Sequence, residues 1–72
     1  MEIARINVGK KGLTESLLNE INLLLEKRGI VKVKLLRNSG MRENKELVVK
    51  ELIERLGCRV TDVRGFVITI ER

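Results

Sequence analysis

The sequence predicts a two-layer α+β (α/β) sandwich in which two helices cover one face of a four-stranded mixed sheet. Three observations support this prediction. Four short segments alternate apolar and polar residues, two longer segments repeat apolar residues at helical spacing, and their order is β-α-β-α-β-β. Because a chain of 72 residues has room for one core, residues 1–72 are expected to form a single domain.

The first strand is predicted over residues 3–8, where Ala4, Ile6 and Val8 alternate with Arg5 and Asn7. The next strand is predicted over residues 30–36, where apolar residues again occupy every second position and lysines stand between them. Strands of this kind have one face in the core and one face open to solvent.

The first helix is predicted over residues 15–28, because its apolar residues follow the spacing of one helix face. Thr14 is placed to cap its start, Leu13 and Leu18 occupy the staple positions around that cap, and Gly29 is placed to end it. The residues on the apolar face are Leu17, Leu18, Ile21, Leu24 and Leu25.

A second helix is predicted over about residues 42–56, with its start within residues 38–43 and its end at Gly57. Its exposed side pairs opposite charges at i,i+4, for example Glu51 with Arg55. The apolar residues of this helix are Val48, Val49, Leu52, Ile53 and Leu56.

The end of the chain is predicted to form a hairpin of two strands, over residues 58–63 and 66–70. Arg64-Gly65 is the expected two-residue turn, since glycine adopts positive φ readily. The residues expected to point inward are Cys58, Val60, Phe66, Ile68 and Ile70.

The open face of the sheet is expected to be polar and basic. Residues 27–40 hold five basic residues and no acidic one, whereas residues 13–26 hold three glutamates and no basic residue. Positive charge is therefore expected on the strands and loops, and negative charge on the helices. The residues predicted to line the open face are Arg5, Asn7, Lys32, Lys34, Arg59, Thr61 and Thr69.

The composition excludes several classes of function. The chain has no histidine and no nucleophile with a matching base, which argues against an enzyme. A lone cysteine without histidine offers no zinc site, so neither a metal nor a cofactor is expected. A single cysteine, Cys58, fits a reducing compartment, and no segment has the length of a membrane span, so a cytoplasmic location is expected. A net charge of +5 and a pI near 9.9 favour a polyanionic partner such as nucleic acid.

The segment Gly9-Lys10-Lys11-Gly12 lies between the first strand and the first helix. Two lysines on a loop whose glycines allow close approach could bind phosphate, and an ordinary glycine-containing turn is the alternative interpretation. The spacing matches neither the Walker P-loop nor the dinucleotide-binding fingerprint, so nucleotide binding is not expected.

Almost the whole chain resembles the CRM domain family, typified by bacterial YhbY-like proteins. The resemblance rests on Gly9-Lys10-Lys11-Gly12-Leu13-Thr14, on Val31-Lys32-Val33-Lys34, and on the pattern of residues 57–72. It implies an RNA-binding fold similar to the C-terminal domain of bacterial translation initiation factor three, with the glycine-flanked loop contacting the RNA backbone. It also implies association with ribosomal precursors or group II introns.

The chain departs from the family pattern in three places. The first strand is expected almost at the start of the sequence, so the helix that usually precedes this strand in the family is not expected here. Glu71 stands near the carboxyl end where the family has an aromatic residue, and the segment 38–42 differs from the usual form.

The prediction for function is a protein that binds structured RNA, expected to be ribosomal RNA or pre-ribosomal particles of the large subunit. Because Phe66 is assigned inward, recognition is expected through phosphates and shape rather than base stacking. The alternative is a protein-interaction module, or a small subunit of a ribonucleoprotein complex, that uses the basic face or an edge strand. A monomer or weak dimer is expected, with neither a membrane nor a small-molecule substrate as partner. The candidate RNA-binding residues are Gly9, Lys10, Lys11, Gly12, Lys32, Lys34, Arg37, Arg59 and Arg64.

Overall fold

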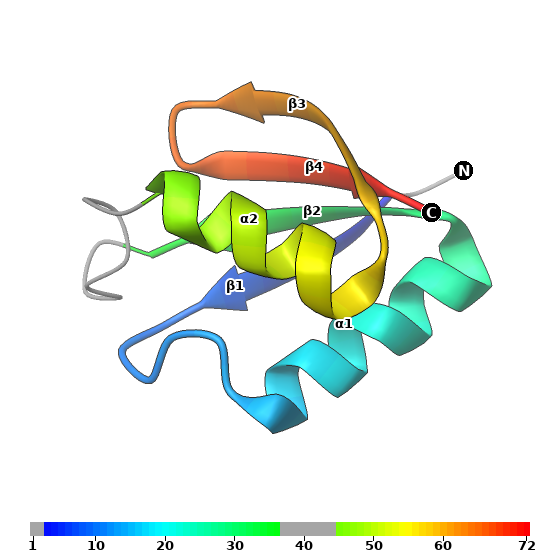
Figure 1. The fold of residues 1–72 in the computed structure, drawn as a ribbon, viewed down its shortest axis with the longest axis horizontal. Helices are drawn as coiled ribbons and strands as arrows, with labels where there is room; N and C mark the ends of the chain where they lie inside the picture. Colours follow the sequence, from blue (N-terminus) through cyan, green and yellow to red (C-terminus); the bar gives the residue numbers. More distant parts are fainter. Residues whose placement is uncertain (1–2, 37–44) are drawn as a thin grey trace.

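A computed structural model of the chain describes residues 3–36 and 45–72, and its elements follow the predicted order (Figure 1). The predicted fold class is confirmed: a four-stranded mixed sheet lies on two helices. The elements are β1 (Ala4–Val8), α1 (Glu15–Arg28), β2 (Ile30–Leu35), α2 (Lys45–Leu56), β3 (Arg59–Arg64) and β4 (Val67–Glu71).

The strands lie in the order β1-β2-β4-β3. β1 and β2 are parallel, because α1 carries the chain back to the starting end of the sheet, whereas β4 runs antiparallel to both of its neighbours. β2 and β4 therefore occupy the centre, and β1 and β3 form the two edges.

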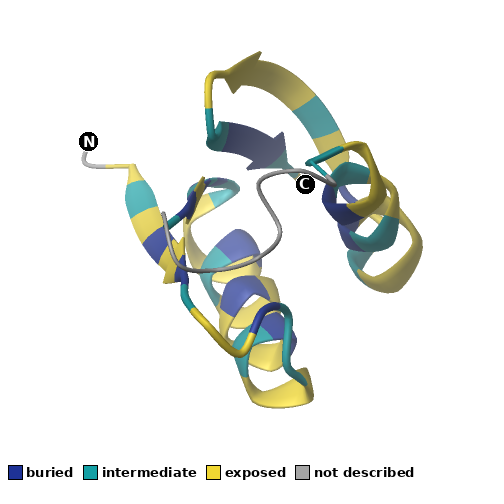
Figure 2. Cartoon of the chain, turned by 90° about the vertical axis from the view of Figure 1, so that its left-hand side faces the viewer, coloured by how far each residue is buried: buried dark blue, intermediate teal, exposed yellow. Residues whose placement is uncertain are grey.

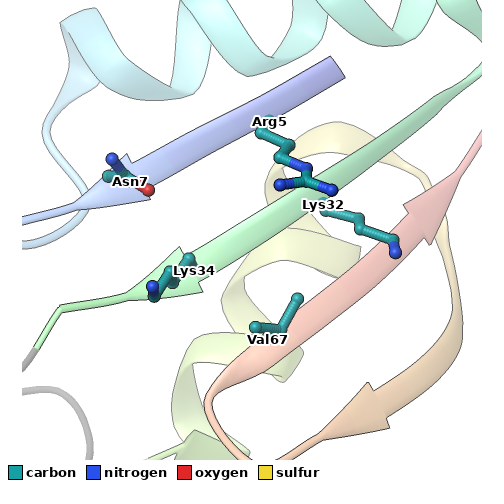
Figure 3. A pocket seen from close by; sticks show the side chains of 5 residues that line it. All are labelled: Arg5, Asn7, Lys32, Lys34 and Val67. Carbon is teal, nitrogen blue, oxygen red and sulfur yellow. The ribbon is translucent and has the colours of Figure 1, made fainter. Parts of the chain in front are cut away.

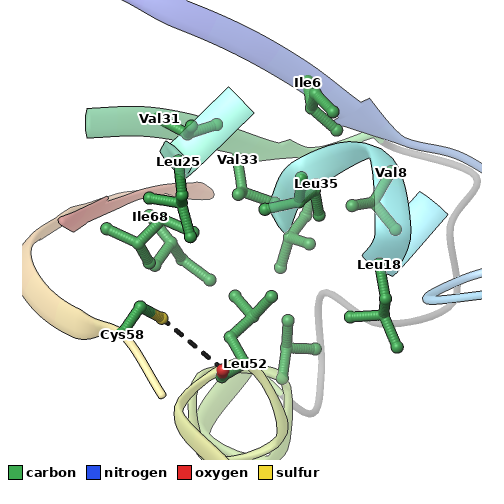
Figure 4. Packing of buried hydrophobic residues seen from close by; sticks show 13 residues of the cluster. Ile6, Val8, Leu18, Leu25, Val31, Val33, Leu35, Leu52, Cys58 and Ile68 are labelled. Atoms are coloured by element: carbon green, nitrogen blue, oxygen red, sulfur yellow. Dashed lines mark hydrogen bonds between the residues drawn. The ribbon is translucent and has the colours of Figure 1, made fainter. Parts of the chain in front are cut away.

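The core lies between the helices and the covered face of the sheet. Neighbouring strands align their apolar residues in rows, one of which joins Ile6, Val33 and Ile68. Figure 4 shows these side chains meeting those of both helices, and Figure 2 shows that burial is concentrated on the facing sides of the two layers. The buried apolar residues are Ile6, Val8, Leu18, Ile21, Leu25, Val31, Val33, Leu35, Val48, Leu52, Cys58, Ile68 and Ile70.

Helix α1 has the predicted boundaries and the predicted caps. Thr14 has extended backbone angles, and its hydroxyl oxygen accepts a hydrogen bond from the Leu17 amide at 3.1 Å. Gly29 has φ +79°, and its amide donates to the Leu25 carbonyl at 2.8 Å. Local sequence therefore suffices to position both ends of this helix.

Helix α2 ends as predicted, since the Gly57 amide donates to the Ile53 carbonyl at 2.9 Å. The placement of Ile53 on the apolar face is wrong, because this side chain is 43 % exposed. Arg55 was expected to pair with Glu51 on the same helix. It instead forms an ion pair with Glu15 of α1 and so links the two helices. The predicted start within residues 38–43 lies outside the described residues.

The terminal hairpin differs from the prediction in two ways. β3 continues to Arg64, so the two-residue turn is Gly65-Phe66 and lies one position later than expected; Gly65 supplies the positive φ of +57°. The alternation predicted for β3 is confirmed through Val60 and is wrong beyond it, because a bulge leaves Thr61 without a register partner. Beyond the bulge, Asp62 pairs with Thr69 on the open face and Val63 pairs with Ile68 on the covered face.

Thr69 is a second exception to the expected open face. It lies on that face as predicted but is only 7 % exposed. It occupies central strand β4, where the longer side chains of Lys32 and Asp62 are its register neighbours on either side. The open face therefore contains a buried position at its centre.

The position of Leu52 predicts a large stability loss on truncation. Leu52 is fully buried among the helices and strands, so Leu52→Ala should lower the free energy of unfolding by about 2–5 kcal/mol. Leu47→Ala on the same helix is the matched control, because Leu47 is 63 % exposed. Urea unfolding measures both variants, and equal losses would contradict the described core.

Cys58 predicts a dependence of stability on alkaline pH. Burial raises the pKa of its thiol above the ordinary value of 9.0, and the Sγ lies 3.5 Å from the Leu52 carbonyl oxygen. The folded state therefore retains the thiol proton at a pH where the unfolded chain loses it. The buried neutral thiol contributes fully to the free energy of unfolding below pH 9.0, and this contribution is lost as the pH rises above that value. Between about pH 8 and about pH 10, the wild type should lose more unfolding free energy than Cys58→Ala. Parallel losses in urea titrations would refute the assignment.

Candidate nucleic-acid interface

The Gly9–Gly12 loop is a tight turn between the end of β1 and the start of α1. The Gly12 amide donates to the Gly9 carbonyl at 3.0 Å, so Lys10 and Lys11 occupy the two central positions of the turn. Both lysines are exposed. The turn thus presents two consecutive ammonium groups to solvent on a short, hydrogen-bonded backbone.

The two glycines of this loop have different roles in the fold. Gly12 is buried and has φ +70°, a conformation that other residues adopt at a cost. Gly9 has no positive φ, and a Cβ there would meet its nearest atom, the Cδ1 of Leu36, at an ordinary 4.0 Å. The fold therefore requires glycine at position 12 but not at position 9.

The loop is joined directly to the start of α1. The Thr14 amide donates to the Gly12 carbonyl at 3.2 Å, and Thr14 then caps the helix. The first helical residue is Glu15, whose carboxylate is paired with Arg55. The helical side of the loop therefore begins with an acidic residue.

Backbone hydrogen bonds gather three segments at one end of the sheet. The Leu36 amide donates to the Val8 carbonyl at 2.9 Å, and the Leu35 amide donates to the Phe66 carbonyl at 2.8 Å. The end of β2 therefore lies between the start of the Gly9–Gly12 loop and the hairpin turn (Figure 1). We refer to this end of the sheet as the loop end.

The strand register arranges the open face in rows. Nearest the loop end, one row runs across Asn7, Lys34, Val67 and Arg64 in strand order β1-β2-β4-β3. The next row runs across Arg5, Lys32, Thr69 and Asp62. Paired residues share a face, so these eight side chains all lie on the side away from the helices.

The half of the open face formed by β1 and β2 contains a basic hollow. Arg5, Asn7, Lys32, Lys34 and Val67 line this hollow, which has a volume of about 440 Å³. In Figure 3 the Arg5 side chain extends from β1 toward β2, where Lys32 projects from the neighbouring strand. Three of the five lining residues are cationic and none is acidic, so the hollow is suited to an anion.

The half formed by β3 and β4 differs because its cations have partners within the chain. The Nε of Arg64 lies 3.1 Å from a carboxylate oxygen of Asp62. Arg59 donates to the Arg72 carbonyl at 3.4 Å and lies in register with Glu71. Positive charge on this half is therefore partly neutralised.

The helical layer is almost balanced in charge. The two helices hold six acidic and five basic residues, because α1 extends through Lys27 and Arg28. The helices are thus less acidic than the charge of residues 13–26 predicted, because that range ends before the two basic residues of the last turn of α1. The difference between the two sides of the molecule arises mainly from the excess of cations on the loop and on the β1–β2 half of the sheet.

Lys45 holds the hairpin turn against the start of α2. Its ammonium group donates to the Gly65 carbonyl at 2.8 Å and lies 5.6 Å from the centre of the Phe66 ring. Phe66 was expected to point inward and is half-buried, packed against the core. Sequence reasoning did not identify Lys45, since no local pattern relates residues 20 positions apart.

The candidate residues fall into three groups in the structure. Lys10 and Lys11 lie on the loop, Lys32 and Lys34 line the hollow, and Arg59 and Arg64 lie on the β3–β4 half. Arg37 lies outside the described residues.

Arg5 and Asn7 belong to the hollow but were absent from the predicted RNA-binding set. Their alternation with the core residues of β1 was the signal that could have identified them, because it placed them on the same face as Lys32 and Lys34.

The described residues form neither a metal-ligand cluster nor a membrane-spanning helix. Among residues 3–36 and 45–72, no three Cys, Asp or Glu side chains come together in a way that could hold a metal ion. Neither described helix is long and apolar enough to cross a membrane.

Comparison with known proteins identifies related sequences. The sequence model of the CRS1/YhbY (CRM) domain matches residues 3–72. A protein of Methanocaldococcus jannaschii, named a probable RNA-binding protein, is 34 % identical over 65 residues, which cover 90 % of this chain and 48 % of that protein. The chain thus spans about half the length of this curated relative.

The loop geometry predicts opposite outcomes for its two glycines. Gly12→Ala should lower the free energy of unfolding by about 1–2 kcal/mol, because alanine at φ +70° is strained. Gly9→Ala should change it by less than about 0.5 kcal/mol, since the added methyl group has room. Thermal and urea unfolding test the pair, and an equal loss at both positions would contradict the turn geometry.

Proposed function

Because this chain belongs to the CRS1/YhbY (CRM) domain family, we propose that it is a non-enzymatic protein that binds structured RNA. The Gly9–Gly12 loop is the proposed primary contact, and the basic open face is the supporting one. The observation that carries this proposal is the presentation of Lys10 and Lys11 on a rigid turn beside a face rich in cations. The name of the archaeal relative supports RNA as the polyanion.

Phosphate contacts are the proposed means of recognition. Lysine and arginine side chains bind the RNA backbone through charge and hydrogen bonds, and such contacts carry little sequence information. The chain has one aromatic residue, Phe66, and its ring lies under Lys45 in the hairpin turn. Base stacking on an aromatic platform of the open sheet is therefore not part of the proposal.

The proposed target is ribosomal RNA, bound during maturation of the large ribosomal subunit in the cytoplasm. Support for this narrower statement comes from the family resemblance noted in the sequence. A folded precursor RNA offers many closely spaced phosphates, which suits a small surface that reads backbone and shape.

The loop lysines provide the direct test of RNA binding. Lys10→Ala/Lys11→Ala should weaken binding to a large-subunit ribosomal RNA transcript and lower the slope of log affinity against log salt by about 1.4–1.8, for two lost phosphate contacts. Lys27→Ala/Lys50→Ala is the matched control, because it removes the same charge from exposed positions on the helices. Filter binding over a salt series measures both.

Three results would contradict the proposal at different levels. Failure of the wild type to bind the transcript would refute RNA binding, and equal losses in the loop and helix variants would refute the loop assignment. Equal affinity for transfer RNA would refute the ribosomal preference. If the protein instead co-purifies with partner proteins and this association survives ribonuclease treatment, the interaction-module alternative gains support.

A further inference from the structure

We propose that the hollow on the β1–β2 half of the open face is a second RNA site that continues from the Gly9–Gly12 loop. In this site Arg5, Lys32 and Lys34 bind phosphates of the strand that the loop holds, and Asn7 hydrogen-bonds a ribose 2′-hydroxyl. This inference rests on the proposed function and deepens it, since it assigns a path to the RNA and adds Arg5 and Asn7 as contacts.

The parallel register shapes the hollow. Arg5 lies beside Lys32 and Asn7 lies beside Lys34, so four polar side chains form a compact array on two adjacent strands. Neighbouring strands are about 4.8 Å apart, and residues two positions apart on a strand are separated by about 6.6 Å. An array of this size brings its cations to a short stretch of one phosphodiester chain.

Unopposed charge distinguishes this array from the rest of the sheet. The lining residues include three cations and no acidic side chain, whereas Arg64 and Arg59 of β3 have Asp62 and the Arg72 carbonyl as partners. A phosphate in the hollow would therefore meet cations that need not break an ion pair with a lining residue.

The hollow and the loop are continuous along β1. Asn7 is two residues before Gly9, and the Leu36 amide bonded to the Val8 carbonyl keeps the end of β2 alongside. The row formed by Asn7 and Lys34 is therefore the part of the hollow nearest the loop (Figure 3). In the other direction from the loop the chain enters α1 at Glu15, whose carboxylate is paired with Arg55, so this side offers no comparable excess of cations. The geometry thus directs an RNA strand from the loop across the open face.

Asn7 adds a different kind of contact. The ammonium and guanidinium groups in the hollow only donate hydrogen bonds, whereas the Asn7 amide can both donate and accept. The 2′-hydroxyl has the same dual character and is the group that separates RNA from DNA. Asn7 is therefore placed to favour RNA among the anions that the cations would accept.

Two single substitutions on the edge strand test this site with a hairpin taken from large-subunit ribosomal RNA and a DNA hairpin of the same sequence. Arg5→Ala should weaken binding to both hairpins and lower the salt slope by about 0.7–0.9, the loss of one phosphate contact. Asn7→Ala should leave the slope unchanged and reduce the preference for RNA about threefold to tenfold, the loss of one hydrogen bond. Lys50→Ala, exposed on α2, is the charge control and should bind like the wild type.

A tethered-cleavage experiment tests the path of the strand. Cys58 is buried, so an iron chelate can be attached through a single new thiol in Asn7→Cys or in Lys11→Cys. The proposal expects cleavage by the two proteins on the same RNA strand within a few nucleotides. If the two proteins cleave opposite strands of the hairpin stem, the continuous path is overturned.

The outcomes separate this inference from the proposed function. Each variant is first checked for unchanged thermal unfolding, which Arg5 and Asn7 should permit because both are exposed. If Arg5→Ala and Asn7→Ala both bind like Lys50→Ala while Lys10→Ala/Lys11→Ala loses affinity, the hollow is refuted and the loop remains. If the wild type binds no RNA hairpin and no ribosomal transcript, the proposed function itself fails.

Discussion

In the parallel pair of β1 and β2, residues of the two strands lie side by side, and this register assigns each side chain to the core or to the open face. Ile6 pairs with Val33 beneath the helices, while the adjacent Arg5 and Lys32 pair on the other side. A shift of one residue would bury the cations and expose the core. The hydrophobic core therefore determines the position of the basic hollow, although the two share no side chains.

The same pairing explains the position of the loop. The hydrogen bond from the Leu36 amide to the Val8 carbonyl extends the β1–β2 contact to the residue before Gly9. At its other end the loop is fixed by the φ of Gly12 and by the Thr14 cap. Lys10 and Lys11 are thus held on a short turn between two anchored elements, and less conformational freedom remains to be lost when they bind a ligand.

Charge is distributed by elements rather than by the chain as a whole. The helices are almost balanced, the β3–β4 half of the sheet pairs its arginines internally, and the loop and the β1–β2 half keep an excess of cations. A net charge of +5 therefore understates the local potential where the cations gather. A surface of this kind, with few aromatic residues, favours contacts to phosphates and sugars over contacts to base faces.

The sequence alone determined the element order, both ends of α1, and the inward and outward residues of β1 and β2, because caps and alternation are local properties. It also located the lysine loop between the first strand and the first helix, and it indicated the family to which the chain belongs. Only the tertiary structure decided where the alternation of β3 breaks, because the bulge at Thr61 depends on pairing with β4. It likewise decided that Arg64 meets Asp62, that Lys45 holds the hairpin turn, and that Arg5 and Asn7 join Lys32 and Lys34 in one hollow. Asp62 and Arg64 share the open face because of the bulge, Lys45 and Gly65 are 20 positions apart, and the hollow depends on the pairing of β1 with β2. Periodicity within one segment encodes none of these.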